Sequence, residues 1–124
     1  MSHICDILGY GGCEVNEWQI QKYITEDGDC PFDEWFLKLD RQTQVRVDVR
    51  LDRVSLGNFG DHKSVGEGVY ELRFFFGPGY RNYYGLDGNQ VVLLLTGGAK
   101  KKQTKDIKTA QRLWQEYKRE QAGD

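Results

Sequence analysis

The stretch from residue 68 to residue 102 constrains the fold most strongly, because apolar, aromatic-rich segments alternate in it with short glycine turns. A period of two begins near residue 61 and predicts four short strands, at residues 62–65, 69–76, 80–86 and 90–96. Asp87-Gly88 is a typical hairpin turn between the last two strands. Residues 91–95 are uniformly apolar, so we expect this strand to be buried on both faces.

Upstream of these strands, the pattern predicts one edge strand and one helix. Residues 13–24 roughly alternate polar and apolar side chains, which is typical of an edge strand with an irregular start. Pro31 suits the first position of a helix that is capped by Asp29 or Cys30. This helix carries one apolar face, which we interpret as core packing and which consists of Phe32, Trp35, Phe36 and Leu39.

Residues 40–57 fit two interpretations. Apolar residues at positions 45, 47, 49 and 51 alternate with polar ones, as they do in a strand. Asp40 is nevertheless a good helix cap, and no glycine or proline follows it before Gly57. We therefore predict a helix, and a second long helix at residues 103–119. The first of them has two apolar faces, with Val45, Val49 and Leu56 on one and Val47, Leu51 and Val54 on the other.

The predicted order is strand, two helices, four antiparallel strands and a C-terminal helix, which defines a small α+β fold with helices packed against one sheet. A chain of 124 residues is long enough for one domain with a single modest core. We expect residues 1–12, with their glycines, to form a flexible lead, residues 13–119 to form the domain, and residues 120–124 to form a tail.

Composition excludes several classes of protein. No apolar run approaches the roughly 18 residues that a membrane span needs, and the first residues do not resemble a signal peptide, so a cytoplasmic protein is the expectation. The three cysteines, Cys5, Cys13 and Cys30, have no CxxC spacing and no histidine cluster beside them. We therefore expect free thiols, no metal site and no cofactor.

The charge is distributed unevenly along the chain, although the net charge is only −2. Residues 1–62 hold 6 Lys/Arg and 12 Asp/Glu, a net of −6, whereas residues 63–119 hold 11 Lys/Arg and 5 Asp/Glu, a net of +6. The last five residues add −2. If the fold keeps the two halves apart, the second half can offer a basic face to an anionic polymer.

Two arginines lie inside the apolar strands, where a guanidinium must be paired or face a ligand. A three-residue loop at Gly77-Pro78-Gly79 would pair Phe76 with Tyr80 and Phe75 with Arg81. Glu71, Arg73, Arg81 and Tyr83 would then share one face of the sheet. A two-residue loop would instead send Arg81 to the opposite face.

Such a face contains the groups that metal-independent RNA cleavage requires. Arginines can stabilise the negative charge on phosphorus during attack by a 2′-hydroxyl, and a carboxylate, lysine or tyrosine can move protons. The tyrosine rings at positions 80, 83 and 84 can stack bases, and the lysines at 100–102, 105 and 108 can hold phosphates. Each group also has a structural interpretation: a Glu71–Arg73 pair across the sheet, cross-strand tyrosine packing, and lysines at the solvated start of a helix.

Three sequence motifs resemble one known family. They are Glu71-Leu72-Arg73, then Gly79-Tyr80-Arg81, then Gly97-Gly98 followed by Lys100, Gln103 and Asp106-Ile107. In this order and with these separations they are similar to the HigB-like branch of the RelE/ParE superfamily of bacterial toxins, often described as addiction-module killer or phage-derived proteins. The resemblance covers roughly residues 30–115 and leaves the first dozen residues outside.

The resemblance implies a type II toxin with a microbial RNase-like fold, which enters the ribosome and cleaves bound mRNA to a 2′,3′-cyclic phosphate and a 5′-hydroxyl. It implies a helix-turn-helix antitoxin as partner, with DNA contact only through the antitoxin complex. By position it assigns the functional cations to Arg73, Arg81 and one of Lys100–Lys102, and Glu71, which stands where some relatives carry a lysine, is our third catalytic candidate. The RNA-binding candidates that the residue types suggest are Lys100, Lys101, Lys102, Lys105, Tyr80 and Tyr83.

Two alternative functions remain open. One member of the same superfamily, ParE, poisons DNA gyrase without cutting RNA, and this interpretation predicts growth arrest that survives substitution of Arg73 and Arg81. A non-catalytic binding protein of the same fold predicts no toxicity. A neighbouring reading frame that encodes a helix-turn-helix protein would favour the toxin interpretations.

Overall fold

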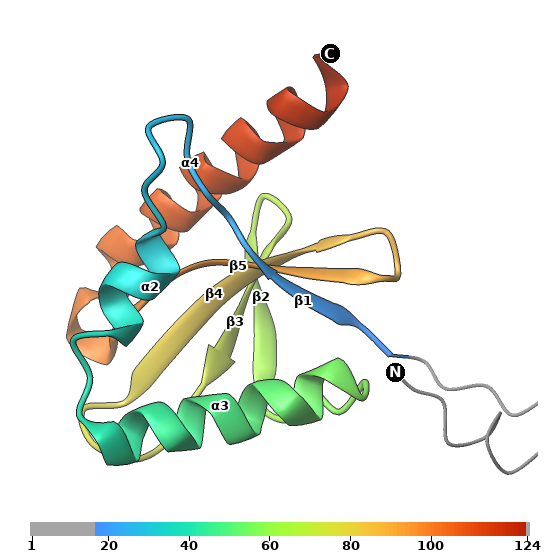
Figure 1. Cartoon of the computed structure of the whole chain (residues 1–124). Coiled ribbons are helices and arrows are strands. Elements are labelled where there is room, and N and C mark those ends of the chain that lie inside the picture. The colour runs from blue at the N-terminus through green and yellow to red at the C-terminus, as the bar shows by residue number, and fades with distance from the viewer. Residues whose placement is uncertain (1–16, 124) are drawn as a thin grey trace, which may run out of the picture.

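The computed structural model describes residues 17–123, which form a five-stranded sheet with helices on both faces (Figure 1). The elements are β1 (Gln19–Lys22), α2 (Pro31–Phe36), α3 (Arg41–Ser55), β2 (His62–Gly66), β3 (Val69–Arg73), β4 (Tyr80–Asp87), β5 (Val91–Ala99), a short 3-10 turn η1 (Lys100–Lys102) and α4 (Gln103–Ala122). This is the predicted order, and the mixed α+β architecture is consistent with a small RelE-like fold. The predicted lead at residues 1–12, with Cys5, lies outside the described residues, as do Cys13 and the start of the predicted first strand.

The strands are arranged in the order β1-β5-β4-β3-β2. The last four strands of the chain are antiparallel neighbours, as predicted, and β1 lies at the edge, parallel to β5, with Gln19 opposite Val91. Because β5 has neighbours on both sides and helices on both faces, its residues 92–95 are buried, which confirms the expectation for this segment.

The face of the sheet covered by α2 and α3 is packed with aliphatic and aromatic side chains. Asp40 caps α3 by accepting a hydrogen bond from the Thr43 backbone N–H at 3.1 Å, which confirms the helical interpretation of residues 40–57 over the strand alternative. Only one of the two predicted apolar faces of α3 reaches the core. The core on this side of the sheet includes Val47, Leu51, Val54, Phe32, Leu72, Phe74, Tyr84, Val92 and Leu94.

The opposite face of the sheet is covered by α4, which crosses it at the back of the view in Figure 1. Ala110, Leu113 and Trp114 are buried here against strand residues. Trp114 lies flat on β4, where a Cβ on Gly85 would come within 2.4 Å of its ring, so only glycine fits at that position. No helix within residues 17–123 combines the length and the apolar character needed to cross a bilayer.

Candidate functional site

Strands β3 and β4 bring the two arginines together. Arg73 lies directly opposite Arg81, and Glu71 lies opposite Tyr83, so strand alternation groups these four residues, as the sequence predicted. Glu71, Arg81 and Tyr83 lie under α4, whereas Arg73, at the very end of β3, lines an open groove beside α3. The register differs by two residues from the one expected for a three-residue loop. The strand ends at Arg73, and the connection is longer because Phe74 turns into the core and two glycines, Gly77 and Gly79, adopt positive φ angles of 58° and 76°. Because side chains alternate along a strand, a shift of the pairing by two residues leaves each side chain on the same face of the sheet.

Arg73 is held by a carboxylate in this structure. Its Nη2 lies 2.8 Å from Oδ1 of Asp61, and its Nε lies 3.2 Å from Oδ2, which is a forked, bidentate pair. The hydrogen bond from Arg73 lowers the pKa of Asp61 below its usual value, because it favours the charged carboxylate. About a third of each side chain remains exposed, 30% for Arg73 and 33% for Asp61, so the guanidinium can exchange this partner for another anion.

A third arginine, Arg50 of α3, fixes the position of this pair. Its guanidinium donates to the backbone carbonyls of Phe59, Asp61 and Arg73, at 2.8 to 3.3 Å. It thereby ties the segment before β2 and the end of β3 to the helix. Sequence reasoning missed Arg50, although its spacing of three from Val47 and four from Val54 places it beside the buried face of α3.

Arg81 belongs to a buried polar cluster beneath the start of α4, formed by Glu71, Arg81, Tyr83, Gln103 and Asp106. The Nε of Arg81 lies 3.9 Å from Oε1 of Glu71, and the side chains are 8% and 0% exposed. Gln103, the first residue of α4, donates a hydrogen bond of 2.9 Å to the same Glu71 oxygen. The Nη1 of Arg81 donates to the carbonyls of Gly79 and Tyr80, at 3.2 and 3.3 Å.

Four buried atoms of this cluster have no hydrogen-bond partner among the described residues: Glu71 Oε2, Arg81 Nε, Tyr83 Oη and Asp106 Oδ2. Burial raises the pKa of the Tyr83 hydroxyl, and the neighbouring carboxylates of Glu71 and Asp106 raise it further. Burial likewise raises the pKa of Asp106, against the lowering effect of Lys102 and Lys105. Unsatisfied polar groups are unfavourable in a packed interior, so packing alone does not account for this cluster.

The lysines at positions 100–102 form η1 and are exposed. A Cβ on Gly79 would lie 3.4 Å from the Cβ of Lys100 and 3.7 Å from Nη1 of Arg81, so the stem of the Lys100 side chain and the Arg81 guanidinium both lie close to the backbone of that glycine. Lys101, Lys102, Lys105 and Lys108 line an open, shallow pocket of about 600 Å³ along the first turns of α4. The start of α4 is therefore the basic part of this helix.

The three tyrosines that we expected to stack bases do not share one face of the sheet, because Tyr83 faces α4 whereas Tyr80 and Tyr84 face α2 and α3. Tyr84 is completely buried in the core. Tyr83 is completely buried under α4, so no base can reach its ring in this conformation. Tyr80 packs against Phe76 and Trp35, at ring-centroid distances of 5.8 and 6.3 Å, and is half-buried. The exposed aromatic residue beside Arg73 is instead Phe75, 79% exposed, which sequence reasoning had placed only as a strand residue.

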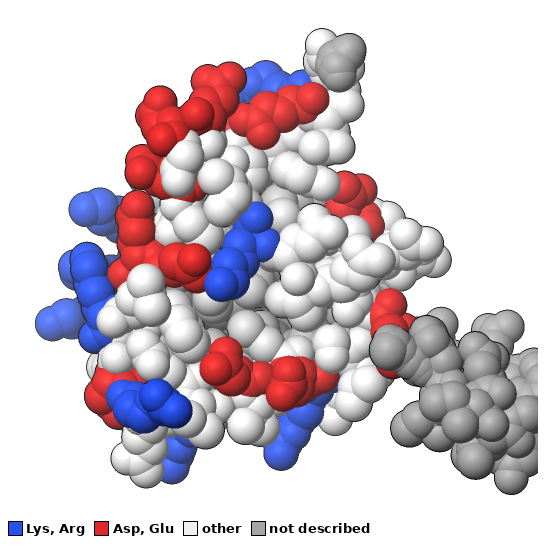
Figure 2. Space-filling model, in the orientation of Figure 1, with Lys and Arg blue, Asp and Glu red and all other residues white. Residues whose placement is uncertain are grey.

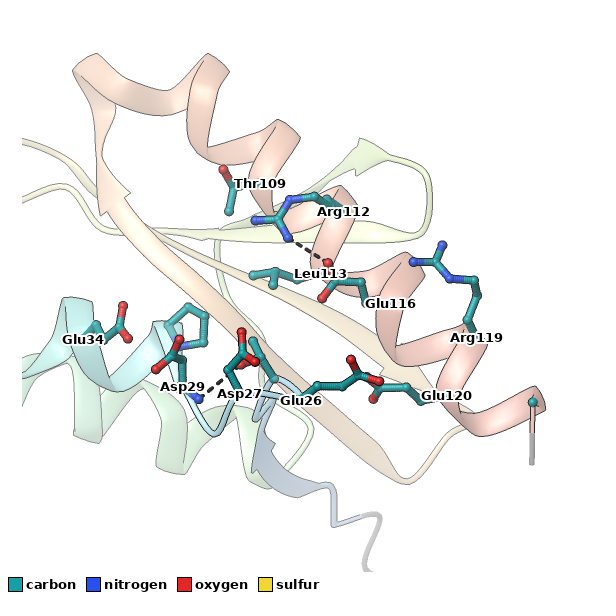
Figure 3. A pocket seen from close by; sticks show the side chains of 13 residues that line it. Glu26, Asp27, Asp29, Glu34, Thr109, Arg112, Leu113, Glu116, Arg119 and Glu120 are labelled. Carbon is teal, nitrogen blue, oxygen red and sulfur yellow. Dashed lines mark hydrogen bonds and ion pairs between the residues drawn. The ribbon is translucent and has the colours of Figure 1, made fainter.

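The acidic half of the sequence does not form a separate lobe. Figure 2 shows acidic side chains gathered over the loop between β1 and α2 and over the adjoining part of α4. Six carboxylates and two arginines line an open pocket of about 800 Å³ between these elements (Figure 3). One of the arginines, Arg112, pairs with Glu116 at 2.8 Å, and Tyr23 donates to Glu120 at 2.9 Å. The pocket is thus acidic because the carboxylates of the β1–α2 loop and α2 face Glu116 and Glu120 of α4.

Within residues 17–123, no three side chains of His, Cys, Asp or Glu cluster in a way that could hold a metal ion. Arg73, Arg81 and the lysines that begin α4 are the described side chains that can recognise an anion.

Comparison with known proteins agrees with this geometry. The sequence model of the family described as "Phage derived protein Gp49-like (DUF891)" matches residues 34–117, from α2 to most of α4. An uncharacterized protein of Haemophilus influenzae is 45% identical to the chain over 86 residues, which cover 68% of this chain and 87% of that protein. The chain therefore belongs to the Gp49-like family, a family of RelE-like toxins associated with toxin–antitoxin systems.

Proposed function

We propose that this protein is the toxin of a type II toxin–antitoxin pair, of the HigB-like branch, and that it cleaves mRNA on the ribosome in the cytoplasm. The observation that carries the proposal is the direct opposition of Arg73 and Arg81 across β3 and β4, with Lys100 beside Arg81. Three cations at one end of a rigid sheet suit the extra negative charge of a phosphate under attack. The cognate partner is a helix-turn-helix antitoxin.

In the proposed reaction, the 2′-oxygen of one nucleotide attacks the adjacent phosphorus and the bond from phosphorus to the 5′-oxygen breaks. The 2′-hydroxyl gives up its proton, the 5′-oxygen takes one up, and the products carry a 2′,3′-cyclic phosphate and a 5′-hydroxyl. Arg73 binds the phosphate after exchanging Asp61 for it, since a guanidinium fork fits either anion. Lys100–Lys102 and Lys105 bind the flanking phosphates.

Glu71 takes a positioning role in this scheme. Its carboxylate is completely buried between Arg81 and Gln103, so it does not reach a proton of bound RNA in this conformation. It instead holds the Arg81 side chain and the first residue of α4 in place. Tyr83, buried on the same face with no hydrogen-bond partner for its hydroxyl among the described residues, does not stack a base.

The proposal is tested by mapping 5′-hydroxyl RNA ends after a short induced pulse of the protein in bacteria. New ends inside translated frames are the expected result, and Arg73→Ala should reduce their number about 100-fold or more, because transition-state charge stabilisation is lost. Arg112→Ala is the matched control, since Arg112 also forms a carboxylate pair but lines the acidic pocket between α4 and the β1–α2 loop. Equal numbers of new ends from Arg73→Ala and the parent protein would contradict the nuclease proposal.

One observation favours a second candidate, a protein-binding toxin of the ParE type that poisons gyrase, or a non-catalytic binder. Both arginines already have intramolecular partners, Asp61 for Arg73 and Glu71 with two carbonyls for Arg81. Growth arrest with an unchanged map of RNA ends, in parent and Arg73→Ala alike, would support the gyrase alternative. Normal growth with unchanged RNA would support the non-catalytic alternative.

A further inference from the structure

The outward side of α3 carries an apolar stripe that nothing in residues 17–123 covers. Val45 and Val49 lie one helical turn apart and are 47% and 43% exposed. They line an open groove of about 340 Å³ whose far wall is formed by Phe74, Phe75 and Phe76 of the β3–β4 connection. We call this set of residues the α3 groove.

The stripe is not required by the core. α3 packs on the sheet through its other apolar face, where Val47 and Val54 are fully buried. Phe75, the most exposed large apolar side chain among the described residues, adds to the same uncovered surface. A contiguous apolar surface beside polar residues is typical of a protein interaction site.

The charged residues that line the groove are mostly positive. Four of its lining residues are arginines, Arg46, Arg50, Arg53 and Arg73, and the one carboxylate among them is Asp61. The guanidinium of Arg46 lies over the ring of Phe76, at 4.5 Å from the centroid, so it lines the rim without closing the groove. An occupant must therefore be apolar along one row and negative along its flanks.

An acidic amphipathic helix fits this description better than RNA does. Two aliphatic side chains at a spacing of four residues present a ridge that another helix can straddle with its own apolar side chains. The two valines offer no flat surface for base stacking and Phe75 is the one exposed ring that lines the groove, whereas phosphates and stacked bases supply most of the contacts in RNA recognition. The mainly apolar floor and the arginine rim thus match leucine-like side chains flanked by glutamates or aspartates.

We propose that the α3 groove binds an acidic amphipathic helix of a partner protein. The apolar side chains of that helix contact Val45, Val49 and Phe75, and its carboxylates pair with Arg46 and Arg53. Such a helix also covers Arg73, which lines the same groove. This last step rests on the proposed function: if the protein is the toxin, the partner is its antitoxin, and it inhibits by covering one of the two phosphate-binding arginines.

The test uses the full-length protein and three synthetic probes. The first is a fluorescent peptide of about 15 residues, roughly four helical turns, with leucines at every third or fourth position and glutamates between them. The second has lysine in place of each glutamate. The third is a single-stranded RNA oligonucleotide. Fluorescence anisotropy gives the affinities, and NMR shifts of the valine methyl groups locate the binding.

The acidic peptide should bind and shift the methyl signals of Val45 and Val49, and the lysine peptide should bind about tenfold more weakly or worse. Val49→Asp should weaken the acidic peptide about tenfold or more, because it places a carboxylate in the apolar floor. Leu37→Asp is the matched control and should change the affinity less than about twofold, since Leu37 is 71% exposed but lies outside the groove. Arg46→Glu should weaken binding, and Arg119→Glu should not, because Arg119 lines the acidic pocket and lies outside the α3 groove.

Equal affinities for the acidic and lysine peptides, or an equal effect of Val49→Asp and Leu37→Asp, would overturn the proposal. So would the absence of binding at millimolar acidic peptide. RNA that shifts the methyl signals of Val45 and Val49 more strongly than the acidic peptide would assign the groove to nucleic acid. None of these measurements depends on RNA cleavage, so a failure here leaves the map of 5′-hydroxyl ends as a separate test of the nuclease.

Discussion

The two faces of the sheet are built differently. The face under α2 and α3 is a continuous aromatic and aliphatic core, in which Phe32, Phe74 and Tyr84 fill the space between helix and strand. The face under α4 combines an apolar core around Trp114 with the polar cluster of Glu71, Arg81, Tyr83, Gln103 and Asp106, where four buried atoms have no partner. The first face stabilises the domain, and the second accepts a loss of stability to hold charged groups in fixed positions.

Leu72 and its neighbour Glu71 point to opposite faces of the sheet. The largest loss of folding stability is expected from a substitution at Leu72. Leu72→Ala should lower the free energy of unfolding by about 2–5 kcal/mol, because the side chain is completely buried among α3 and sheet residues and its removal leaves a cavity. Denaturant unfolding of the purified protein measures this change. A loss below about 1 kcal/mol would contradict the description of this face as the stabilising core.

The second prediction concerns the Glu71–Arg81 pair on the other face. Glu71→Gln should destabilise by about 1–3 kcal/mol, since it leaves the guanidinium buried without a counter-charge. Adding Arg81→Met should restore part of the loss, because an apolar side chain in that place needs no partner. A double-mutant cycle measures the coupling, expected at about 0.5–3 kcal/mol. Additive effects of the two substitutions would show that the pair does not interact.

The third prediction compares the neighbouring glycines Gly97 and Gly98. A Cβ at Gly97 would lie 2.3 Å from the Trp35 ring, and one at Gly98 would lie 1.9 Å from Oδ2 of Asp106. The ring is wedged in the core, whereas the carboxylate is the end of a flexible side chain. Gly97→Ala should therefore cost about 1–3 kcal/mol, and Gly98→Ala less than half of that. Thermal unfolding of both variants measures the two losses of stability. A larger loss for Gly98→Ala than for Gly97→Ala would contradict the view that the face under α2 and α3 is the more tightly packed one.

The smallest effect is expected from Asp106→Asn, and it depends on pH. Burial raises the pKa of Asp106 in the folded protein, so its ionised form destabilises the fold once the pH rises above the unfolded value of about 3.8. The substitution should increase stability at pH 7 by about 1 kcal/mol or less, because the group is partly exposed and Lys102 and Lys105 lie nearby. At pH 3 the increase should vanish. Melting temperatures of the parent protein and the variant at pH 7 and pH 3 test this prediction. A larger increase in stability at pH 3 than at pH 7 would contradict it.

Much of the fold was predictable because its patterns are local. The alternation in residues 62–96, the glycine turns and the Asp40 cap determine the order of strands and helices. The length of the β3–β4 connection was not predictable, because Phe74 can continue a strand or turn inwards without any change in the sequence pattern. The parallel pairing of β1 with β5 has no local signal either.

The candidate site was predictable in part. Alternation correctly grouped Glu71, Arg73, Arg81 and Tyr83 on one face, since the side chains of a strand alternate whatever covers them. It contained no information on which helix lies above that face, so the burial of Tyr83 and Glu71 under α4 could not be foreseen. The role of Arg50 depends on backbone carbonyls from two different segments, the one before β2 and the end of β3, which only the tertiary structure brings together.

The pairing of β1 with β5 has a consequence for synthesis of the chain. Gln19 finds its partner only after Val91 has been made, and the start of α4 that covers Arg81 comes later still. Contacts of such long sequence separation form late in folding, so a nascent chain that ends before β5 has neither a complete sheet nor its cationic site. A protein that acts on translating ribosomes would thus be inactive while it is being made and would become competent only when its last helix has emerged.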